Sequence, residues 1–286
     1  MQDSHRLLQF PGDILGSAVL HDPGAKDDGA TGQAALPNFK ASDFLNITIT
    51  TGTFPGIENF WYVKPWITGK GHALAALEGY LAPNTYYVDP SSDAVAIIKT
   101  MLTQLGEELC PGPSDALDQY IMDKTQCMAN QAIITVPAGV PGAGKTMGVF
   151  DALKKYYTSD PVTALQEALI IGSLTEREAR TPTHFFLVAS DYYDRYKKPV
   201  PGTAGYLNAD VAEQYWLGTA KNPWPTLTQL PSSSPSNPFN LYKATGLPPS
   251  AISAPSIPAL YGAMFPPNTG YYYFFFSNCD HTNHYY

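Results

Sequence analysis

Apolar residues recur every three or four positions in three stretches of the chain, and this spacing predicts helices. The first stretch covers residues 91–109. Its apolar side consists of Val95, Ile98, Met101, Leu102 and Leu105. The other two stretches follow Asp160-Pro161 and Thr181-Pro182, where an N-cap residue precedes a proline suited to the first helical position. The second helix should end near Ala179. The apolar stripe of the third is Phe185, Val188, Ala189, Tyr192 and Tyr196.

Strand signals are fewer. Apolar and polar residues alternate over residues 44–51, which predicts a strand. Aromatic residues 271–274 predict another, with residues 278–283 as the turn of a hairpin. Residues 23–37 are rich in Gly, Asp, Ala and Pro, and residues 222–238 in Pro and Ser, so both are expected to be loops.

Two acidic residues lie at the end of the helix expected over 161–179. Steps of four, three and four residues from Leu165 pass Leu169 and Gly172 and reach Glu176, on the face expected to turn inward. Glu178 lies about 200° further around the helix and is expected to point away from the interior. A carboxyl group in apolar surroundings stays protonated more readily, as a general acid must. Glu176 is therefore the candidate acid, and a surface pair of glutamates is the alternative.

Four segments, in order, resemble the signature segments of one enzyme family. They are residues 78–86, 175–179, 237–242 with 246–252, and 271–274 with His284. Residues 175–179 read Thr-Glu-Arg-Glu-Ala, where the family has roughly Val-Glu-Lys-Glu-Ala. The family is the MltG/YceG family of endolytic murein transglycosylases, and the resemblance extends from Leu77 to the C-terminus.

The resemblance implies an α+β fold. Residues 1–70 would form an N-terminal region, a partial or divergent LysM-like subdomain. A YceG-like transglycosylase domain would follow over residues 71–286, and it would contain a variable Gly-rich insertion near 130–150. It also implies cleavage of the bond between N-acetylmuramic acid and N-acetylglucosamine, with formation of 1,6-anhydro ends. Glu176 would act as a single acid and base, and no metal or other cofactor is needed.

The resemblance also implies substrate-binding residues. These are Glu78, Tyr86, Asn208, Asp210, Asn240, Tyr242 and His284. For Glu78 and Tyr86 a role in bracing the fold is the alternative. The chain departs from the family at Asn208, where Gln is usual, and at Val211, where Pro is usual. A peptidoglycan-binding module without activity is therefore a second hypothesis.

Two further motifs suggest other functions. Residues 139–146 match the P-loop pattern Gly-x4-Gly-Lys-Ser/Thr and suggest a nucleotide-binding protein using Lys145. However, too few Val- and Ile-rich runs follow to build a parallel sheet, so a Gly-rich insertion loop is favoured. Cys279, Asp280, His281 and His284 have a spacing that could ligate a metal, but the hairpin turn is an equally good interpretation.

Composition limits the partners and the location. With 17 Lys and Arg against 25 Asp and Glu, the net charge is −8, which argues against nucleic acid. The expected partners are peptidoglycan glycan strands and the cell-wall synthesis machinery. No apolar run of 18 residues occurs, whereas family members carry an N-terminal anchor, so the chain is expected to be an ectodomain or fragment on the extracytoplasmic face of the bacterial membrane. Cys110 and Cys127 either form a disulfide, leaving Cys279 unpaired, or are buried free thiols.

Overall fold

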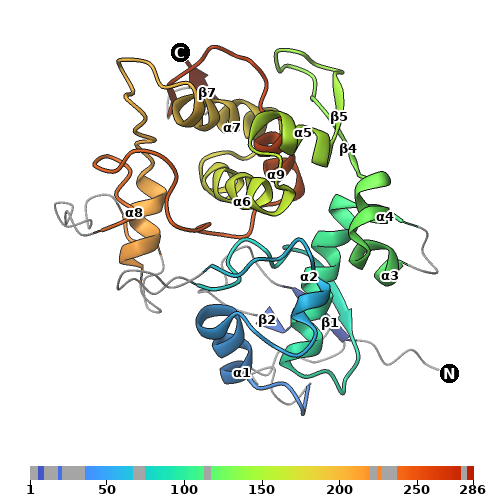
Figure 1. The fold of residues 1–286 in the computed structure, drawn as a ribbon. Coiled ribbons are helices and arrows are strands. Elements are labelled where there is room, and N and C mark those ends of the chain that lie inside the picture. Colours follow the sequence, from blue (N-terminus) through green and yellow to red (C-terminus); the bar gives the residue numbers. More distant parts are fainter. Residues whose placement is uncertain are drawn as a thin grey trace. The chain divides into compact units, whose positions relative to one another are not determined.

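The chain forms two compact units, Met1–Asn130 and Gln131–Tyr286, each with buried apolar residues of its own (Figure 1). The computed structural model describes residues 6–9, 19–20, 36–66, 75–112, 117–218, 224–226, 237–277 and 282–286. Among these residues helices predominate, and the strands pair antiparallel in small sheets. This mixture agrees with the predicted α+β class. The predicted boundary at residue 70 and the LysM-like subdomain stay predictions.

Short helices surround one long helix in the N-terminal unit. The helices are α1 (Ala41–Leu45), the π-helix η2 (Asn46–Thr51), the 3-10 helix η3 (Ile57–Asn59), α2 (Ala94–Leu109), α3 (Leu117–Met122) and α4 (Lys124–Ala129). Strands β1 (Arg6–Gln9), β2 (Val19–Leu20) and β3 (Thr85–Val88) form a sheet in the order β2-β1-β3. Helix α2 confirms the helix predicted over 91–109, because Asp93 caps it and Ile98, Met101, Leu102 and Leu105 are buried, although Val95 is only half-buried.

The strand predicted over residues 44–51 is wrong. These residues continue α1 into η2, which ends at Gly52 with a φ of 62°. The buried side chains are Phe44, Ile47 and Thr48, at helical rather than alternating spacing, and the Thr48 hydroxyl donates to the Phe44 carbonyl at 2.9 Å. The alternating β-branched residues favour a strand, but burial of Phe44, Ile47 and Thr48 on one side of a helix has outweighed that preference.

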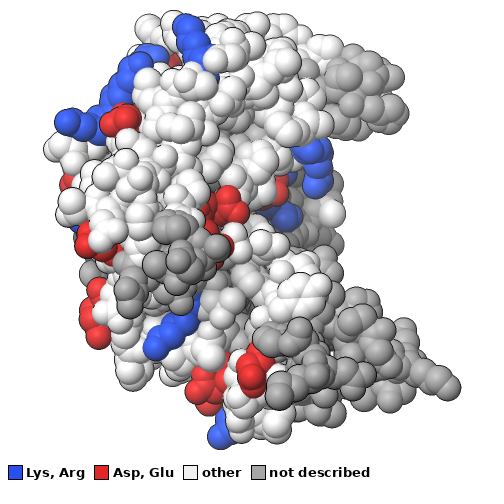
Figure 2. Space-filling view, turned by 90° about the vertical axis from the view of Figure 1, so that its right-hand side faces the viewer, with Lys and Arg blue, Asp and Glu red and all other residues white. Residues whose placement is uncertain are grey.

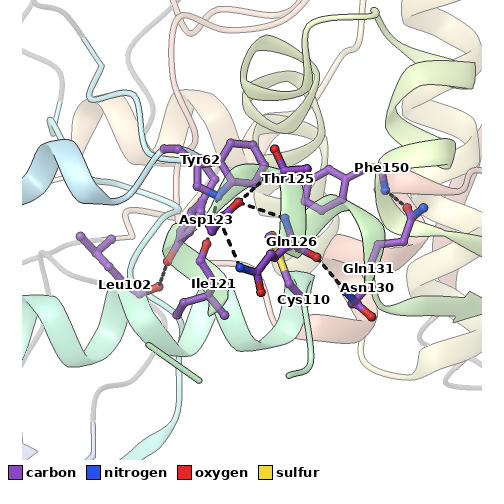
Figure 3. The surroundings of a disulfide bond; sticks show 12 residues. Tyr62, Leu102, Cys110, Ile121, Asp123, Thr125, Gln126, Asn130, Gln131 and Phe150 are labelled. Carbon is purple, nitrogen blue, oxygen red and sulfur yellow. Dashed lines mark hydrogen bonds between the residues drawn. A yellow bond between two sulfur atoms is a disulfide. The ribbon is translucent and has the colours of Figure 1, made fainter. Parts of the chain in front are cut away.

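A disulfide joins Cys110 to Cys127, which decides between the two hypotheses for these cysteines (Figure 3). Cys110 is the C-terminal cap of α2, and Cys127 lies in α4, so the bond fixes the end of the long helix to a short one. Asp123 starts α4 by accepting hydrogen bonds from the backbone N–H groups of Thr125 and Gln126. Both cysteines are fully buried.

Helices α6, α7 and α9 form the centre of the C-terminal unit (Figure 1). Its helices are α5 (Val149–Tyr156), α6 (Pro161–Glu178), α7 (Pro182–Lys197), α8 (Asp210–Leu217) and α9 (Ile257–Met264). Asp160 caps α6 and Thr181 caps α7, which confirms both predicted helices. Strands β6 (Phe274–Ser277) and β7 (Thr282–Tyr285) pair as a C-terminal hairpin. The hairpin agrees with the prediction, but its first strand begins at Phe274 rather than at residue 271, and Thr282 and Asn283, predicted in the turn, belong to the second strand.

Two glycines let α9 approach its neighbours closely. A Cβ atom on Gly172 of α6 would lie 3.4 Å from the Leu260 Cα of α9, and one on Gly262 of α9 would lie 3.0 Å from the Phe185 carbonyl oxygen of α7. A side chain at Gly262 would meet the α7 backbone too closely, and one at Gly172 would require a small shift of its neighbours, so glycine at these positions allows the close packing of the three helices.

The segment that resembles a P-loop is a hairpin. Strands β4 (Ile133–Thr135) and β5 (Thr146–Gly148) pair antiparallel on either side of it. The N–H of Val136 donates to the Lys145 carbonyl, and the N–H of Gly144 to the Val136 carbonyl. A P-loop needs a helix starting at Lys145, whereas here a strand follows and α5 begins only at Val149. The structure contradicts the nucleotide-site hypothesis and agrees with a Gly-rich loop.

Charged groups are sparse on the face shown in Figure 2. Lys and Arg side chains occur there in small separate groups and form no continuous basic surface of the kind that nucleic acids require. No helix within the described ranges combines the length and apolar character needed to cross a membrane. Residues 278–281, with most of the expected loops over 23–37 and 222–238, lie outside the described residues.

Candidate active site

The two glutamates at the end of α6 contact different neighbours. Glu176 faces the start of α9, where its Oε2 atom accepts hydrogen bonds from the backbone N–H of Ser256 at 2.9 Å and from its hydroxyl at 2.6 Å. Ser256 is the N-cap of α9, so the Glu176 carboxylate satisfies a backbone donor that the helix itself cannot. Glu176 thus ties the end of α6 to the start of α9.

Glu178 lies in the more apolar environment of the two. Burial, the larger cause, and the nearby charge of Asp210 together raise its pKa from 4.5 to about 7, while Arg177 and a hydrogen bond with Tyr192 oppose the shift. Near neutral pH a large fraction of Glu178 is therefore protonated. Glu176 and Glu178 are both half-buried, so Glu178 is less exposed than the sequence led us to expect.

Helix α6 explains this difference, because it is buried on all sides just before the two glutamates. Residues 168–175 are buried without interruption, so the helix has no solvent face there. Two residues 200° apart on the helix then face two different interior neighbours: α9 for Glu176, and the region of α7 and α8 for Glu178.

Asp210 and Tyr242 form the acidic neighbour of Glu178. Tyr242 donates its hydroxyl hydrogen bond to the Oδ1 atom of Asp210 at 2.5 Å. Asp210 is the first residue of α8, where the helix dipole favours a negative charge. Tyr242 is half exposed, and burial together with Asp210 raises its pKa.

Asn208 and Asn240 hold the segment that carries Tyr242. The Oδ1 atom of Asn240 accepts the Tyr242 N–H at 3.2 Å, and the N–H of Asn208 donates to the Leu241 carbonyl at 3.0 Å. Asn208 has a φ of 51°, a left-handed conformation that Asn tolerates better than most residues. Four of the predicted residues, Asn208, Asp210, Asn240 and Tyr242, are thus connected by hydrogen bonds around the segment 240–242, and two of them, Asp210 and Tyr242, interact electrostatically with Glu178.

Comparison with known proteins identifies the family. The model of the YceG-like family matches residues 31–286. The chain belongs to the YceG-like family. It is 26% identical over 199 residues to a protein of Bacillus subtilis (strain 168) named endolytic murein transglycosylase. The aligned region covers 69% of this chain but only 41% of that relative. A solved structure of a YceG-like protein from Listeria monocytogenes has the same fold, with a TM-score of 0.55 and 23% identity over 89% of this chain and 67% of that one.

Two predicted residues of this YceG-like chain belong to the N-terminal unit. Glu78 is buried, and its backbone carbonyl accepts the Trp66 Nε1–H at 2.7 Å. Tyr86 is buried and donates its hydroxyl to the Ala82 carbonyl at 2.5 Å, and burial raises its pKa. These contacts suit bracing of the fold, and a role in substrate binding stays a prediction.

His284 lies on the outer face of the C-terminal hairpin. Its ring stacks on Phe275, with centroids 5.0 Å apart. The neighbouring Phe274 points to the opposite face and contacts Tyr192 edge-on at 5.7 Å. His284 therefore lies on the face of the hairpin opposite to Phe274, and its place in the substrate cleft stays a prediction.

Sequence reasoning assigned no role to Tyr192 or Ser256 and underestimated the burial of Glu178. The uninterrupted small and apolar run over residues 168–175 was an available signal for Glu178, because a helix without a polar face is buried on all sides. No local signal pointed to Ser256, which lies 80 positions from Glu176 in sequence.

Proposed function

We propose that the chain is the catalytic part of a murein transglycosylase that cleaves peptidoglycan glycan strands outside the cytoplasm. Family membership and the name of the Bacillus subtilis relative support the reaction class. One observation carries the catalytic proposal: Glu178, half-buried beside Tyr192 of α7, has a carboxyl pKa raised to about 7 by desolvation and by the charge of Asp210. A group with this pKa can donate and recover a proton near neutral pH.

The acid in this proposal is Glu178 rather than Glu176. The Oε2 atom of Glu176 already accepts two hydrogen bonds from Ser256, one from its backbone N–H and one from its hydroxyl, and both join α6 to α9. Glu178 combines burial with a negative neighbour, two conditions that favour the protonated form. Glu176, expected from the sequence to be the acid, is the alternative that the experiment below tests in parallel.

The reaction needs one acid that becomes a base. Protonated Glu178 gives its proton to the glycosidic oxygen between N-acetylmuramic acid and N-acetylglucosamine as the bond from C1 to that oxygen breaks. The C6 hydroxyl of the N-acetylmuramic acid then attacks C1 and forms the 1,6-anhydro ring. Its proton passes to the Glu178 carboxylate, which restores the acid without consuming water. An ordinary glycosidase would instead need two carboxyl groups across the bond.

The disulfide supports a location outside the cytoplasm. Disulfides such as Cys110–Cys127 persist in oxidising compartments and are rare in the cytosol. Glycan strands would be the substrate there, and the machinery that builds the wall is the proposed partner. A binding module without activity would fit the same location, so product analysis must separate the two.

The test is mass spectrometry of uncrosslinked glycan strands after incubation with the wild type, Glu178→Gln and Glu176→Gln. We expect fragments ending in 1,6-anhydro-N-acetylmuramic acid from the wild type and from Glu176→Gln, and none from Glu178→Gln. Loss of product in Glu176→Gln alone would move the acid back to Glu176. Reducing ends would indicate hydrolysis, and binding without cleavage by the wild type would indicate a wall-binding module.

A further inference from the structure

Arg195 of α7 is a buried cation, 5% exposed, whose hydrogen bonds go to backbone carbonyls. Its Nε atom donates to the Tyr272 carbonyl at 2.6 Å, and its Nη1 atom donates to the Leu207 carbonyl at 2.7 Å. Hydrogen bonds from a charged donor are stronger than those between neutral groups. Because the guanidinium is planar and rigid, it fixes both carbonyls in one geometry relative to α7.

Asp191 lies one turn earlier on the same helix and attracts Arg195 without directing it. The Oδ1 atom of Asp191 is 3.6 Å from the Nε atom of Arg195, which is longer than a hydrogen bond. The Asp191 side chain is fully buried, and neither of its oxygens accepts a hydrogen bond from the described residues. The two carbonyls therefore set the orientation of the guanidinium, and the carboxyl group affects only the local charge.

The Leu207 carbonyl belongs to the peptide group that joins Leu207 to Asn208, and this group is held on both sides. Arg195 binds its oxygen, while its N–H, which is the N–H of Asn208, donates to the Leu241 carbonyl at 3.0 Å. A peptide group is planar, so two hydrogen bonds on opposite sides fix its orientation. The fixed plane supports the left-handed conformation of Asn208, whose φ is 51°.

Residues 205–208 and 241–246 are paired with each other, and we call them the paired loops. Besides the Asn208 hydrogen bond, Tyr206 pairs with Thr245 in an isolated β-bridge. The guanidinium holds the first loop, and the first loop holds the second. A single side chain of α7 therefore contributes to the placement of both.

We propose that Arg195 is a positioning residue for substrate binding, because it fixes the paired loops, and with them Asn208 and Tyr242, relative to α7. This inference rests on the proposed function and on the predicted role of these two residues in sugar binding. Tyr192, which forms a hydrogen bond with Glu178, lies three residues before Arg195 on the same side of α7. One helix thus carries both a neighbour of the proposed acid and the anchor of the paired loops.

Three variants separate the geometry of Arg195 from its charge. Arg195→Lys keeps the charge but has a single nitrogen, which cannot reproduce the planar hold on two carbonyls from separate segments. Asp191→Asn removes the neighbouring carboxyl group and keeps the guanidinium. Lys198→Gln removes another cation of the α7 end, which pairs with Asp194 at 2.9 Å and whose described contacts do not include the paired loops.

The experiment measures cleavage of uncrosslinked glycan strands by the wild type and these variants, once circular dichroism has shown that each folds. Arg195→Lys should raise KM about tenfold and change kcat less than about twofold, because the loops move while the acid stays in place. Asp191→Asn and Lys198→Gln should keep the wild-type KM. An unchanged KM in Arg195→Lys, or an equal rise in either control, would overturn the proposal. If Arg195→Lys does not fold, Arg195→Gln, which can still donate one hydrogen bond, makes the same test.

Hydrogen exchange gives a second readout that needs no activity. In Arg195→Lys the Asn208 amide should exchange about tenfold faster than in the wild type, whereas the amide of Leu169, in the middle of α6, should be unchanged. Equal acceleration at both amides would show a loss of stability only and overturn the inference, as would an unchanged rate at Asn208. Absence of anhydro products from the wild type would overturn the proposed function instead, and the exchange rates would still decide whether Arg195 positions the loops.

Discussion

Glu176 and Glu178 lie two residues apart on one helix, yet the protein uses their carboxyl groups in different ways. Glu176 accepts two hydrogen bonds from Ser256 and joins α6 to α9. Glu178 is half-buried and interacts with the negative charge of Asp210, and its pKa is raised to about 7. The difference shows that the chemistry of a carboxyl group is set by the neighbours that the fold supplies rather than by its sequence motif.

The largest expected effect concerns the stability of Glu178→Gln at different pH. The folded-state pKa of Glu178, about 7, is above its ordinary value of 4.5, so its contribution to stability is fully present below about pH 4.5 and is lost as the pH rises through about 7. Between pH 5 and pH 8 the wild type should lose about 2 to 3 kcal/mol from this group. Glu178→Gln cannot ionise and should not lose this stability. In urea unfolding, the free energy of unfolding of Glu178→Gln should therefore increase relative to that of the wild type as the pH rises.

Glu178→Asp is the matched control for that measurement, because it keeps an ionisable group and should retain the pH dependence. If the stability difference between Glu178→Gln and the wild type were the same at pH 5 and pH 8, Glu178 would have the same pKa in the folded and the unfolded protein. The contrast between the two glutamates would then disappear.

A smaller effect is expected at Glu176. Glu176→Ala removes the acceptor for the N–H and hydroxyl of Ser256 and should lower the free energy of unfolding by about 2 kcal/mol. Glu176→Gln keeps an amide oxygen at the same place and should cost less than about 1 kcal/mol. Urea unfolding of both variants gives the comparison. Equal losses would show that the hydrogen bonds to Ser256 contribute nothing measurable.

Sequence reasoning succeeded where a signal is local. The N-caps Asp160 and Thr181, each followed by proline, fixed the starts of α6 and α7, since capping needs only neighbouring residues. It failed where distant contacts decide the structure. The alternation over residues 44–51 became helical once one side was buried, and the burial of Glu178 depends on residues from α7 and α8. The P-loop pattern matched in composition, but its backbone conformation was set by strand pairing.

The smallest expected effect comes from Tyr192, whose hydrogen bond acts on Glu178 in the direction opposite to the charge of Asp210. The Tyr192 hydrogen bond lowers the pKa of Glu178, because it favours the charged carboxylate. Tyr192→Phe keeps the ring that contacts Phe274 and removes only this bond, so the alkaline limb of kcat/KM should move to higher pH by about half a unit.

Tyr193→Phe is the control for this prediction, since the Tyr193 hydroxyl donates to the Tyr156 carbonyl at 2.8 Å and does not act on Glu178. Its pH profile should match that of the wild type. A downward movement of the limb in Tyr192→Phe would mean that Tyr192 favours the protonated acid. An upward movement of the limb in Tyr192→Phe, with Tyr193→Phe unmoved, would instead trace the alkaline limb to Glu178, because the Tyr192 hydrogen bond lowers the pKa of that carboxyl group.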